Sequence, residues 1–339
     1  MKAKNTTAVY SRKRVPLQDV IPLETPFFIC VDPSSVCNIT CNYCVQFDHK
    51  TAKSTNFHTS IMSLELGRKI IDYLKEFSKP INVLQWYGWG EPLLNRNLPE
   101  MIHYAKDSNV ALSVETITNG ILLTPELSDR LINSGIDRIN ISVQSMTQEG
   151  YLKICGKKID FEEYVNNIRY LYEHKNSSLT VYVKIADVGL EKPEEEQLFY
   201  DTFGDICDEI MVEKIINVRD DAAANENIPQ NNGKGVFGQE AYDRKVCPYL
   251  FYRLFICSDG VCALCNADWY RDFVVGDVTK QSIKEIWNGP ALREIQKRHL
   301  RQERHSLDLC AKCGNIKYYP IDNIDAYAKE LLYKLENEE

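Results

Sequence analysis

Three cysteines within eight residues constrain this chain more than any other feature of its sequence. Cys37, Cys41 and Cys44 follow directly after an apolar run that is typical of a buried strand. Thiolates are soft ligands that select iron–sulfur clusters or zinc. Three ligands on one short loop can hold three irons of a four-iron cluster and leave the fourth iron open. Zinc is the alternative, because His49 or His58 could complete a Cys3His site.

The composition limits the class of protein. The chain has 339 residues, of which 44% are apolar, enough for one large domain or a large and a small one. A net charge of −8 argues against nucleic acid or an anionic membrane surface as the main partner. Because the chain has no long apolar stretch and no signal peptide, we expect no membrane partner and a cytoplasmic location. Twelve cysteines in such a protein favour metal or redox chemistry over disulfides.

Strand and helix patterns alternate through the first two thirds of the chain. Helices are expected after the N-caps Ser63 and Thr124, and around Phe161–Tyr172. Strands are expected at 27–32, 81–87, 111–116, 136–143, 179–185 and 209–215. The alternation predicts an α/β fold with a parallel sheet, and six β/α units predict a partial (β/α)6 barrel like an incomplete TIM barrel.

Changes in composition predict the domain boundaries. The stretch after the barrel is rich in Asn, Gly and Ala and resembles a linker. Beyond it, six of the twelve cysteines fall within Cys247–Cys313, which indicates a small metal-bound domain. The expected parts are a flexible N-terminal arm (1–24), the barrel (25–220), a linker (221–240), the cysteine-rich domain (241–320) and a C-terminal amphipathic helix (321–339).

Small and polar residues gather where the expected strands end. Active sites of parallel β/α barrels form at the C-terminal ends of the strands, where the three-cysteine loop also begins. Each residue has a plain structural alternative: Glu91 could be a helix N-terminal acid, and Asn119-Gly120 could be only a turn. The residues at these strand ends are Gly90, Glu91, Pro92, Asn119, Ser142, Gln144 and Lys184.

A second set of four cysteines has the spacing C-x17-C-x44-C-x2-C, formed by Cys247, Cys265, Cys310 and Cys313. Four thiolates can ligate an iron–sulfur cluster fully, or form a zinc ribbon, since C-x2-C pairs are common in zinc sites. Cys257 and Cys262 come shortly before the second ligand, Cys265. They could be packing residues, spare ligands or hydrogen-atom donors.

The first cysteine loop, with Tyr43 before its last cysteine, resembles the signature of the radical S-adenosylmethionine enzymes. In that family a [4Fe–4S] cluster binds S-adenosylmethionine at its open iron and cleaves it to a 5′-deoxyadenosyl radical. The segment Gly88–Pro92 resembles the Gly-Gly-Glu-Pro motif of the family, with Trp89 in place of the first glycine. The resemblance implies that Tyr43 and the seven strand-end residues contact the cofactor.

The second cysteine set, together with Asp268-Trp269 and Gly276-Asp277 after Cys265, resembles the SPASM or twitch extension of the same family. There the four thiolates hold an auxiliary [4Fe–4S] cluster. Because no cysteine follows Cys313, the resemblance implies one auxiliary cluster. Within the family, the stretch is most similar to the 2-deoxy-scyllo-inosamine dehydrogenase group.

The resemblance implies hydrogen abstraction from a sugar, cyclitol or other polyol-like small molecule, followed by dehydrogenation or epimerisation. A flavodoxin- or ferredoxin-type protein is the expected reductant. Arg219 is a candidate base and Cys262 a candidate hydrogen donor. The alternatives are a maturase of a ribosomally synthesised peptide, although only 36 residues precede Cys37, and a non-enzyme that serves as an electron carrier or zinc scaffold.

Overall fold

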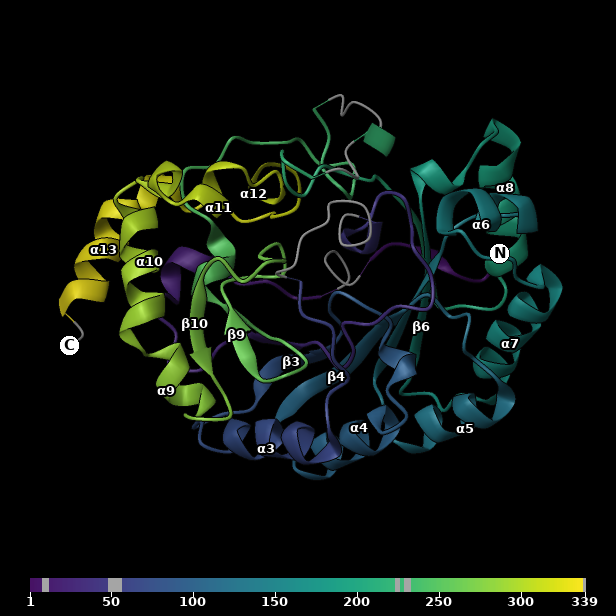
Figure 1. Cartoon of the computed structure of the whole chain (residues 1–339), viewed down its shortest axis with the longest axis horizontal. Helices are drawn as coiled ribbons and strands as arrows, with labels where there is room; N and C mark the ends of the chain where they lie inside the picture. Colours follow the sequence, from purple (N-terminus) through teal and green to yellow (C-terminus); the bar gives the residue numbers. More distant parts are fainter. Residues whose placement is uncertain (8–11, 48–56, 223–225, 229–232, 338–339) are drawn as a thin grey trace.

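The protein is built on one ten-stranded sheet with the order β1-β7-β6-β5-β4-β3-β2-β8-β9-β10 (Figure 1). A computed structural model describes residues 1–7, 12–47, 57–222, 226–228 and 233–337. The strands are β1 (Lys4–Asn5), β2 (Phe28–Val31), β3 (Ile81–Trp86), β4 (Ala111–Thr118), β5 (Arg138–Val143), β6 (Thr180–Ala186), β7 (Glu209–Glu213), β8 (Arg253–Ile256), β9 (Val261–Ala263) and β10 (Val274–Asp277).

Strands β2 to β7 pair in parallel, each with the next, and helices cross between them. Figure 1 shows α3, α4, α5 and α7 along the outer side of this sheet. The predicted partial barrel is therefore confirmed, with all six predicted strands present. The crossing helices are α3 (Leu64–Leu74), α4 (Leu98–Asp107), α5 (Pro125–Asn133), α6 (Gln148–Cys155), α7 (Phe161–His174) and α8 (Pro193–Phe203).

Local sequence explains where the predicted helices begin and end. The Ser63 side chain accepts from the Leu66 amide at the start of α3, and Thr124 does the same for Leu127 in α5. Gly135 follows α5 with φ +78°, a conformation that favours glycine. The helices α4, α6 and α8 were not predicted; α8 buries only Phe199 and Phe203, so its periodic signal is weak.

The cysteine-rich region extends the barrel sheet. Strand β8 pairs in parallel with β2, and β9 and β10 then continue antiparallel. The barrel and the C-terminal region are thus joined through backbone hydrogen bonds. The remaining helices are α9 (Ile283–Trp287), α10 (Pro290–Leu300), α11 (Asp308–Ala311), α12 (Asn315–Tyr318) and α13 (Ala328–Asn337). The C-terminal helix is shorter than the expected 321–339.

The N-terminal segment, expected as a flexible arm, packs against the barrel wherever it is described. Strand β1 pairs in parallel with β7. Arg12 forms an ion pair with the buried Glu115 of β4, and Arg14 reaches Asp322 at 2.5 Å. Arg12 and Arg14 therefore pair with a buried and a half-buried carboxylate, and these two contacts tie this part of the segment to the barrel.

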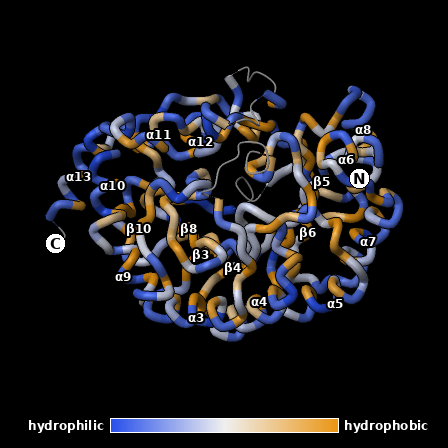
Figure 2. The backbone as a smooth tube through the Cα atoms, in the orientation of Figure 1, coloured by the Kyte–Doolittle hydropathy of each residue, from blue (hydrophilic) through white to orange (hydrophobic). Residues whose placement is uncertain are grey.

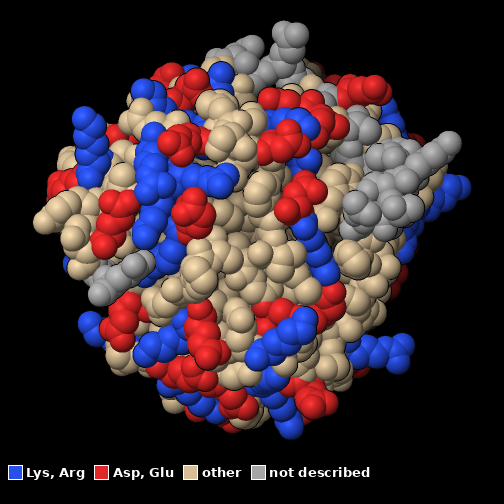
Figure 3. All heavy atoms as spheres, turned by 60° about the vertical axis from the view of Figure 1, so that its left-hand side comes forward, with Lys and Arg blue, Asp and Glu red and all other residues tan. Residues whose placement is uncertain are grey.

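Apolar residues concentrate between the sheet and its helices, as the hydropathy colouring shows (Figure 2). A second apolar cluster includes Cys30, Trp89, Phe255 and Trp269, and therefore joins β2 and β8 to the segments that follow β3 and β9. On the face drawn in Figure 3, positive and negative side chains intermingle. Within the described ranges, no helix is both long and apolar enough to cross a membrane.

Candidate active site

The first cysteine loop leaves the C-terminal end of β2 and is held by backbone contacts from α6. The Thr40 amide donates to Cys155 O at 3.0 Å, and the Asn42 amide to Ile154 O at 2.9 Å. Cys41 is buried, whereas Cys37 and Cys44 are half-buried. The Sγ atoms of Cys41 and Cys155 lie 3.7 Å apart. The loop is thus anchored at one side and presents its outer two thiols toward accessible space.

Glu91 is almost fully buried and ties the second strand-end motif to the third. Its carboxylate accepts from the Thr118 hydroxyl at 2.6 Å, the Asn119 amide at 2.8 Å and the Leu93 amide at 2.9 Å. Burial raises the pKa of Glu91, and these hydrogen bonds oppose the rise. Pro92 begins the 3-10 turn that the Glu91 side chain caps. Glu91, which is predicted to contact the cofactor, therefore also fixes residues 118 and 119.

Asn119 then reaches the cysteine loop directly. Its Nδ2 donates to Asn38 Oδ1 at 2.7 Å, next to Cys37. Gly90 makes a second contact with this loop. A Cβ on Gly90 would lie 2.3 Å from the carbonyl oxygens of Ser34 and Val36, so no side chain fits there. The structure thus brings Gly90, Glu91, Pro92 and Asn119 together around the cysteine loop, as the sequence predicted.

Tyr43, Gln144 and Ser142 form a second group of predicted cofactor contacts. The Tyr43 hydroxyl donates to Gln144 Oε1, and the Cys41 Sγ lies 3.5 Å from the same oxygen. Gln144 Nε2 donates to Ser142 O at 2.8 Å. Lys184 of β6 lies opposite Ser142 of β5 in the parallel pairing of the two strands. The Lys184 ammonium lies 2.7 Å from Glu213 Oε2. All eight predicted cofactor contacts thus lie at one edge of the sheet.

The thiols of the first loop fit a cluster by their chemistry. Burial, with smaller contributions from Glu91 and the neighbouring thiols, raises the pKa of Cys37 to about 12. An isolated thiol of this kind stays protonated, whereas a bound iron cluster stabilises the thiolate. The fourth cluster position has no cysteine in this loop, which is what cofactor ligation requires. His49 lies outside the described residues, and His58 is exposed.

The second cysteine set converges on one small cavity, which we name the auxiliary cavity. It has a volume of about 30 Å³, and its lining includes all four predicted ligands: Cys247, Cys265, Cys310 and Cys313. Burial raises the pKa of Cys247 to about 12, and the nearby Cys313 adds to the rise. Four thiols around one cavity fit an iron–sulfur cluster without an open coordination position.

A chain of hydrogen bonds connects the two cysteine loops. Gln46, two residues after Cys44, donates from Nε2 to Trp89 O at 2.6 Å. The Trp89 indole N–H donates to Asn266 O at 2.8 Å, and Asn266 follows the ligand Cys265. Trp89 also packs against Phe255 with ring centroids 5.1 Å apart. The residue that differs from the expected glycine therefore links the first loop to the second.

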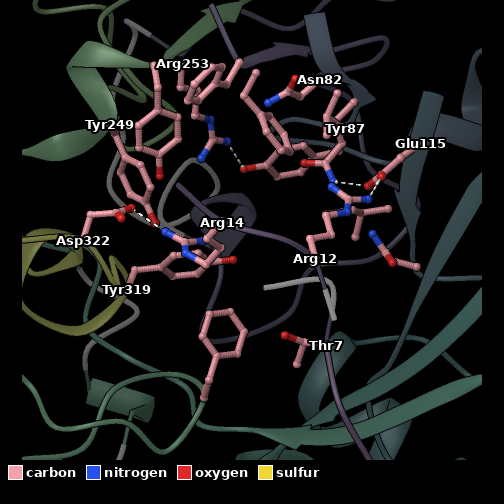
Figure 4. Close-up of a pocket in the computed structure, with 18 of the residues that line it drawn as sticks. Thr7, Arg12, Arg14, Asn82, Tyr87, Glu115, Tyr249, Arg253, Tyr319 and Asp322 are labelled. Carbon is pink, nitrogen blue, oxygen red and sulfur yellow. Dashed lines mark hydrogen bonds and ion pairs between the residues drawn. The ribbon is translucent and has the colours of Figure 1, made fainter. Parts of the chain in front are cut away.

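The lumen of the barrel contains a cavity of about 570 Å³, which we name the lumen cavity. Its walls combine tyrosine rings with paired charges. Tyr182 donates to Glu213 at 2.9 Å, and Lys184 pairs with the same carboxylate. Figure 4 shows Arg12 and Arg14 entering it from the N-terminal segment, beside Glu115 and Asp322. Lys184 is the predicted cofactor contact that also lines this cavity, so the two sites adjoin.

The two proposed catalytic residues do not line the lumen cavity. Cys262 is fully buried in the main apolar core, on β9. Arg219 is buried against Trp269 and Tyr270 and pairs with Asp221 at 3.0 Å. Burial lowers the pKa of Arg219, but its carboxylate partners outweigh this and leave the pKa above its ordinary value. Such an arginine is a poor base, and its contacts explain it as a structural residue beside Cys313.

The polar residues of the lumen cavity were missed at the sequence level. Asn140, Tyr182 and Arg253 lie inside strands that otherwise appear apolar. The sequence pattern that could have indicated them is a polar residue on the inward face of a strand. Gln85 and Tyr87, two positions apart at the end of β3, are an example. That alternation is weak in short buried strands, and it indicates a lumen only after the barrel is known.

Comparisons with known proteins agree with this arrangement. The Radical SAM superfamily matches residues 31–198, and SPASM, an iron–sulfur cluster-binding domain, matches residues 247–314. The chain carries a radical SAM domain followed by a SPASM domain, and its cofactors are S-adenosylmethionine and iron–sulfur clusters.

Curated relatives match only part of the chain. A probable GTP 3′,8-cyclase of Methanococcus maripaludis (strain C5) is 36% identical over 118 residues, which is 35% of this chain and 36% of the relative. The AdoMet-dependent heme synthase of Methanosarcina barkeri is 27% identical over 43% of this chain and 39% of that protein. The chain thus spans little more than a third of these relatives.

Solved structures share the fold over most of the chain. BtrN in complex with AdoMet and 2-DOIA is 20% identical, covers 88% of this chain and 97% of its own, and has a TM-score of 0.55. Streptococcus suis SuiB bound to S-adenosylmethionine is 14% identical, with 92% and 76% covered and a TM-score of 0.63. At these identities the likeness is one of fold.

Proposed function

We propose that this chain is a radical S-adenosylmethionine oxidoreductase whose substrate is a sugar, cyclitol or other polyol-like small molecule in the lumen cavity. The cavity itself carries the proposal. Its volume of about 570 Å³ lies in the range of small-molecule sites. Tyrosine rings and paired polar groups line it, a lining that suits a hydroxylated ring. It adjoins the predicted cofactor site through Lys184.

The residues that line the lumen cavity favour dehydrogenation of the substrate over epimerisation. When bound, the first cluster and its cofactor supply the 5′-deoxyadenosyl radical, and the auxiliary cluster supplies an electron acceptor. Epimerisation needs a hydrogen donor beside the substrate, and no described cysteine is among the residues that line the cavity. Cys30 is not one of the lining residues, although its Sγ lies 3.1 Å from Nε of the lining residue Arg253. Epimerisation remains the second candidate.

The substrate proton needs an acceptor in the cavity. Glu213 is the best placed group, because its carboxylate already accepts from Tyr182 and Lys184 on the lumen face of β6. Arg219 lacks both the position and the basicity. A flavodoxin- or ferredoxin-type reductant in the cytoplasm is part of the same proposal.

The first experiment is anaerobic reconstitution, followed by iron and zinc analysis and an assay for 5′-deoxyadenosine. Two clusters predict about eight irons per chain with little zinc. About four irons with one zinc would remove the electron acceptor and favour epimerisation; zinc alone would refute the radical function. Polyols deuterated at each carbon are then screened for transfer of deuterium into 5′-deoxyadenosine. Transfer supports the proposal, whereas stimulation of cleavage by peptides alone would point to a peptide maturase.

A further inference from the structure

Arg253 differs from the other cations of the lumen cavity in its partners. Arg12 pairs with Glu115, Arg14 with Asp322, and Lys184 with Glu213. Lys13 lies exposed at the same cavity. Among the ion pairs of the described residues, none includes Arg253, although its side chain belongs to the cavity wall. Among the described residues, Arg253 is therefore an enclosed positive charge of this cavity that no carboxylate balances.

Within the described parts of the chain, Arg253 contacts neutral groups. Its Nε donates to Cys30 Sγ at 3.1 Å, and its Nη2 donates to Tyr87 Oη at 2.6 Å. The guanidinium carbon lies 5.5 Å from the ring centroid of Tyr249 and 5.7 Å from that of Tyr87. Figure 4 shows the guanidinium between these two tyrosines, facing the cavity. Rings and neutral acceptors orient the group but leave its net charge in place.

An enclosed cation without an anion is costly, so its presence in a cavity indicates a ligand. Nη1 makes no hydrogen bond with the part of the chain that the structure describes, and this leaves a donor for one more acceptor. A guanidinium fork binds carboxylate and phosphate oxygens with short, charge-assisted hydrogen bonds. The aromatic surroundings reduce the competition from water, which strengthens such a bond.

We propose that Arg253 binds an anionic group of the substrate, a carboxylate or a phosphate, and so selects acidic or phosphorylated polyols over neutral ones. This inference rests on the proposed function and narrows its substrate class. Cys30 and Tyr87 act as positioning residues, because they hold the plane of the guanidinium. The cavity would then carry a balanced charge only when the substrate is bound.

The test measures binding without turnover, on reconstituted protein with S-adenosylmethionine and no reductant. Glucose, glucuronate and glucose 6-phosphate serve as probes in isothermal titration calorimetry. We expect at least one of the two anions to bind roughly tenfold or more tightly than glucose, as for a charge-assisted bond. The preferred anion identifies the carboxylate or the phosphate as the recognised group. In Arg253→Met this preference should disappear.

Lys13→Met is the matched control, because it removes the same charge from an exposed position of the same cavity. We expect it to keep most of the preference. Arg253→Lys keeps the charge without the fork and should lose part of the preference, which provides a second variant if Arg253→Met does not fold. If neither anion binds more tightly than glucose, or if the preference persists in the Arg253 variants, the proposal is wrong. Formation of 5′-deoxyadenosine, assayed separately on the same preparations, tests the radical function independently.

Discussion

Asp32 offers a sharp test of the electrostatics beside the first cysteine loop. It follows β2 and is fully buried, and neither carboxylate oxygen has a hydrogen-bond partner of normal geometry among the described residues. A Cβ on Gly88 would lie 2.3 Å from its Cγ, so the carboxyl group is tightly enclosed. Burial raises the pKa of Asp32 from 3.8 to about 7, although the nearby amides of Ser34 and Trp89 lower it slightly.

The raised pKa makes Asp32→Asn more stabilising at high pH than at low pH. Between the unfolded and folded pKa values, the unfolded chain loses the proton while the folded protein keeps it, so wild-type stability falls as pH rises. At about 1.4 kcal/mol per pKa unit, the carboxyl group costs roughly 2 kcal/mol at pH 5.5 and roughly 4 kcal/mol above pH 7. The advantage of Asp32→Asn should therefore grow by about 2 kcal/mol between pH 5.5 and pH 8.5.

Anaerobic urea unfolding, followed by far-ultraviolet circular dichroism at both pH values, measures this difference. Comparison between two pH values cancels any constant effect of the amide. The exposed Asp19→Asn is the control and should show no pH-dependent gain. An equal effect of Asp32→Asn at pH 5.5 and pH 8.5 would refute the reasoning, because it would mean that the folded carboxyl ionises normally.

Three further predictions concern the cluster sites. Replacing all three cysteines of the first loop by Ala should abolish 5′-deoxyadenosine formation and leave about four irons per chain, measured by iron analysis; retained cleavage would disprove the cluster assignment. Replacing Cys310 and Cys313 by Ala should leave about four irons and stop substrate oxidation, whereas normal product formation would make the auxiliary site structural only. Gly90→Ala should destabilise the fold by about 1–3 kcal/mol and weaken S-adenosylmethionine binding, because its Cβ meets two backbone carbonyls that cannot move independently; unchanged calorimetric affinity and urea midpoint would contradict this.

Much of the barrel was predictable because its signals are local. Strand-length apolar runs predicted β2 to β7, and caps such as Ser63 and Thr124 marked where helices begin. Cysteine spacing predicted the first ligand set and the Cys310–Cys313 pair, since short loops bring nearby thiols together. The meeting of Cys247 with the distant Cys310 was implied only by resemblance, because spacing alone does not fix a long-range contact.

The remaining features depend on contacts between distant segments. Pairing of β8 with β2 joins residues more than 200 positions apart, and no local pattern indicates it. The entry of Arg12 into the lumen depends on the buried position of Glu115, which the sequence shows only as an acid in a strand. No sequence motif indicated that Arg253 lines the cavity. Cys262 and Arg219 were chosen by position in the sequence, and the structure places both away from the lumen cavity.

The hydrogen-bonded chain from Gln46 through Trp89 to Asn266 has a consequence for how the protein matures. A cluster that orders the first loop would fix Trp89, and Trp89 would in turn order the loop that carries Cys265. Thermodynamic linkage makes this reciprocal, so each cluster would raise the affinity of the protein for the other by the same factor. Iron loading would then be cooperative, with empty and fully loaded molecules favoured over half-loaded ones.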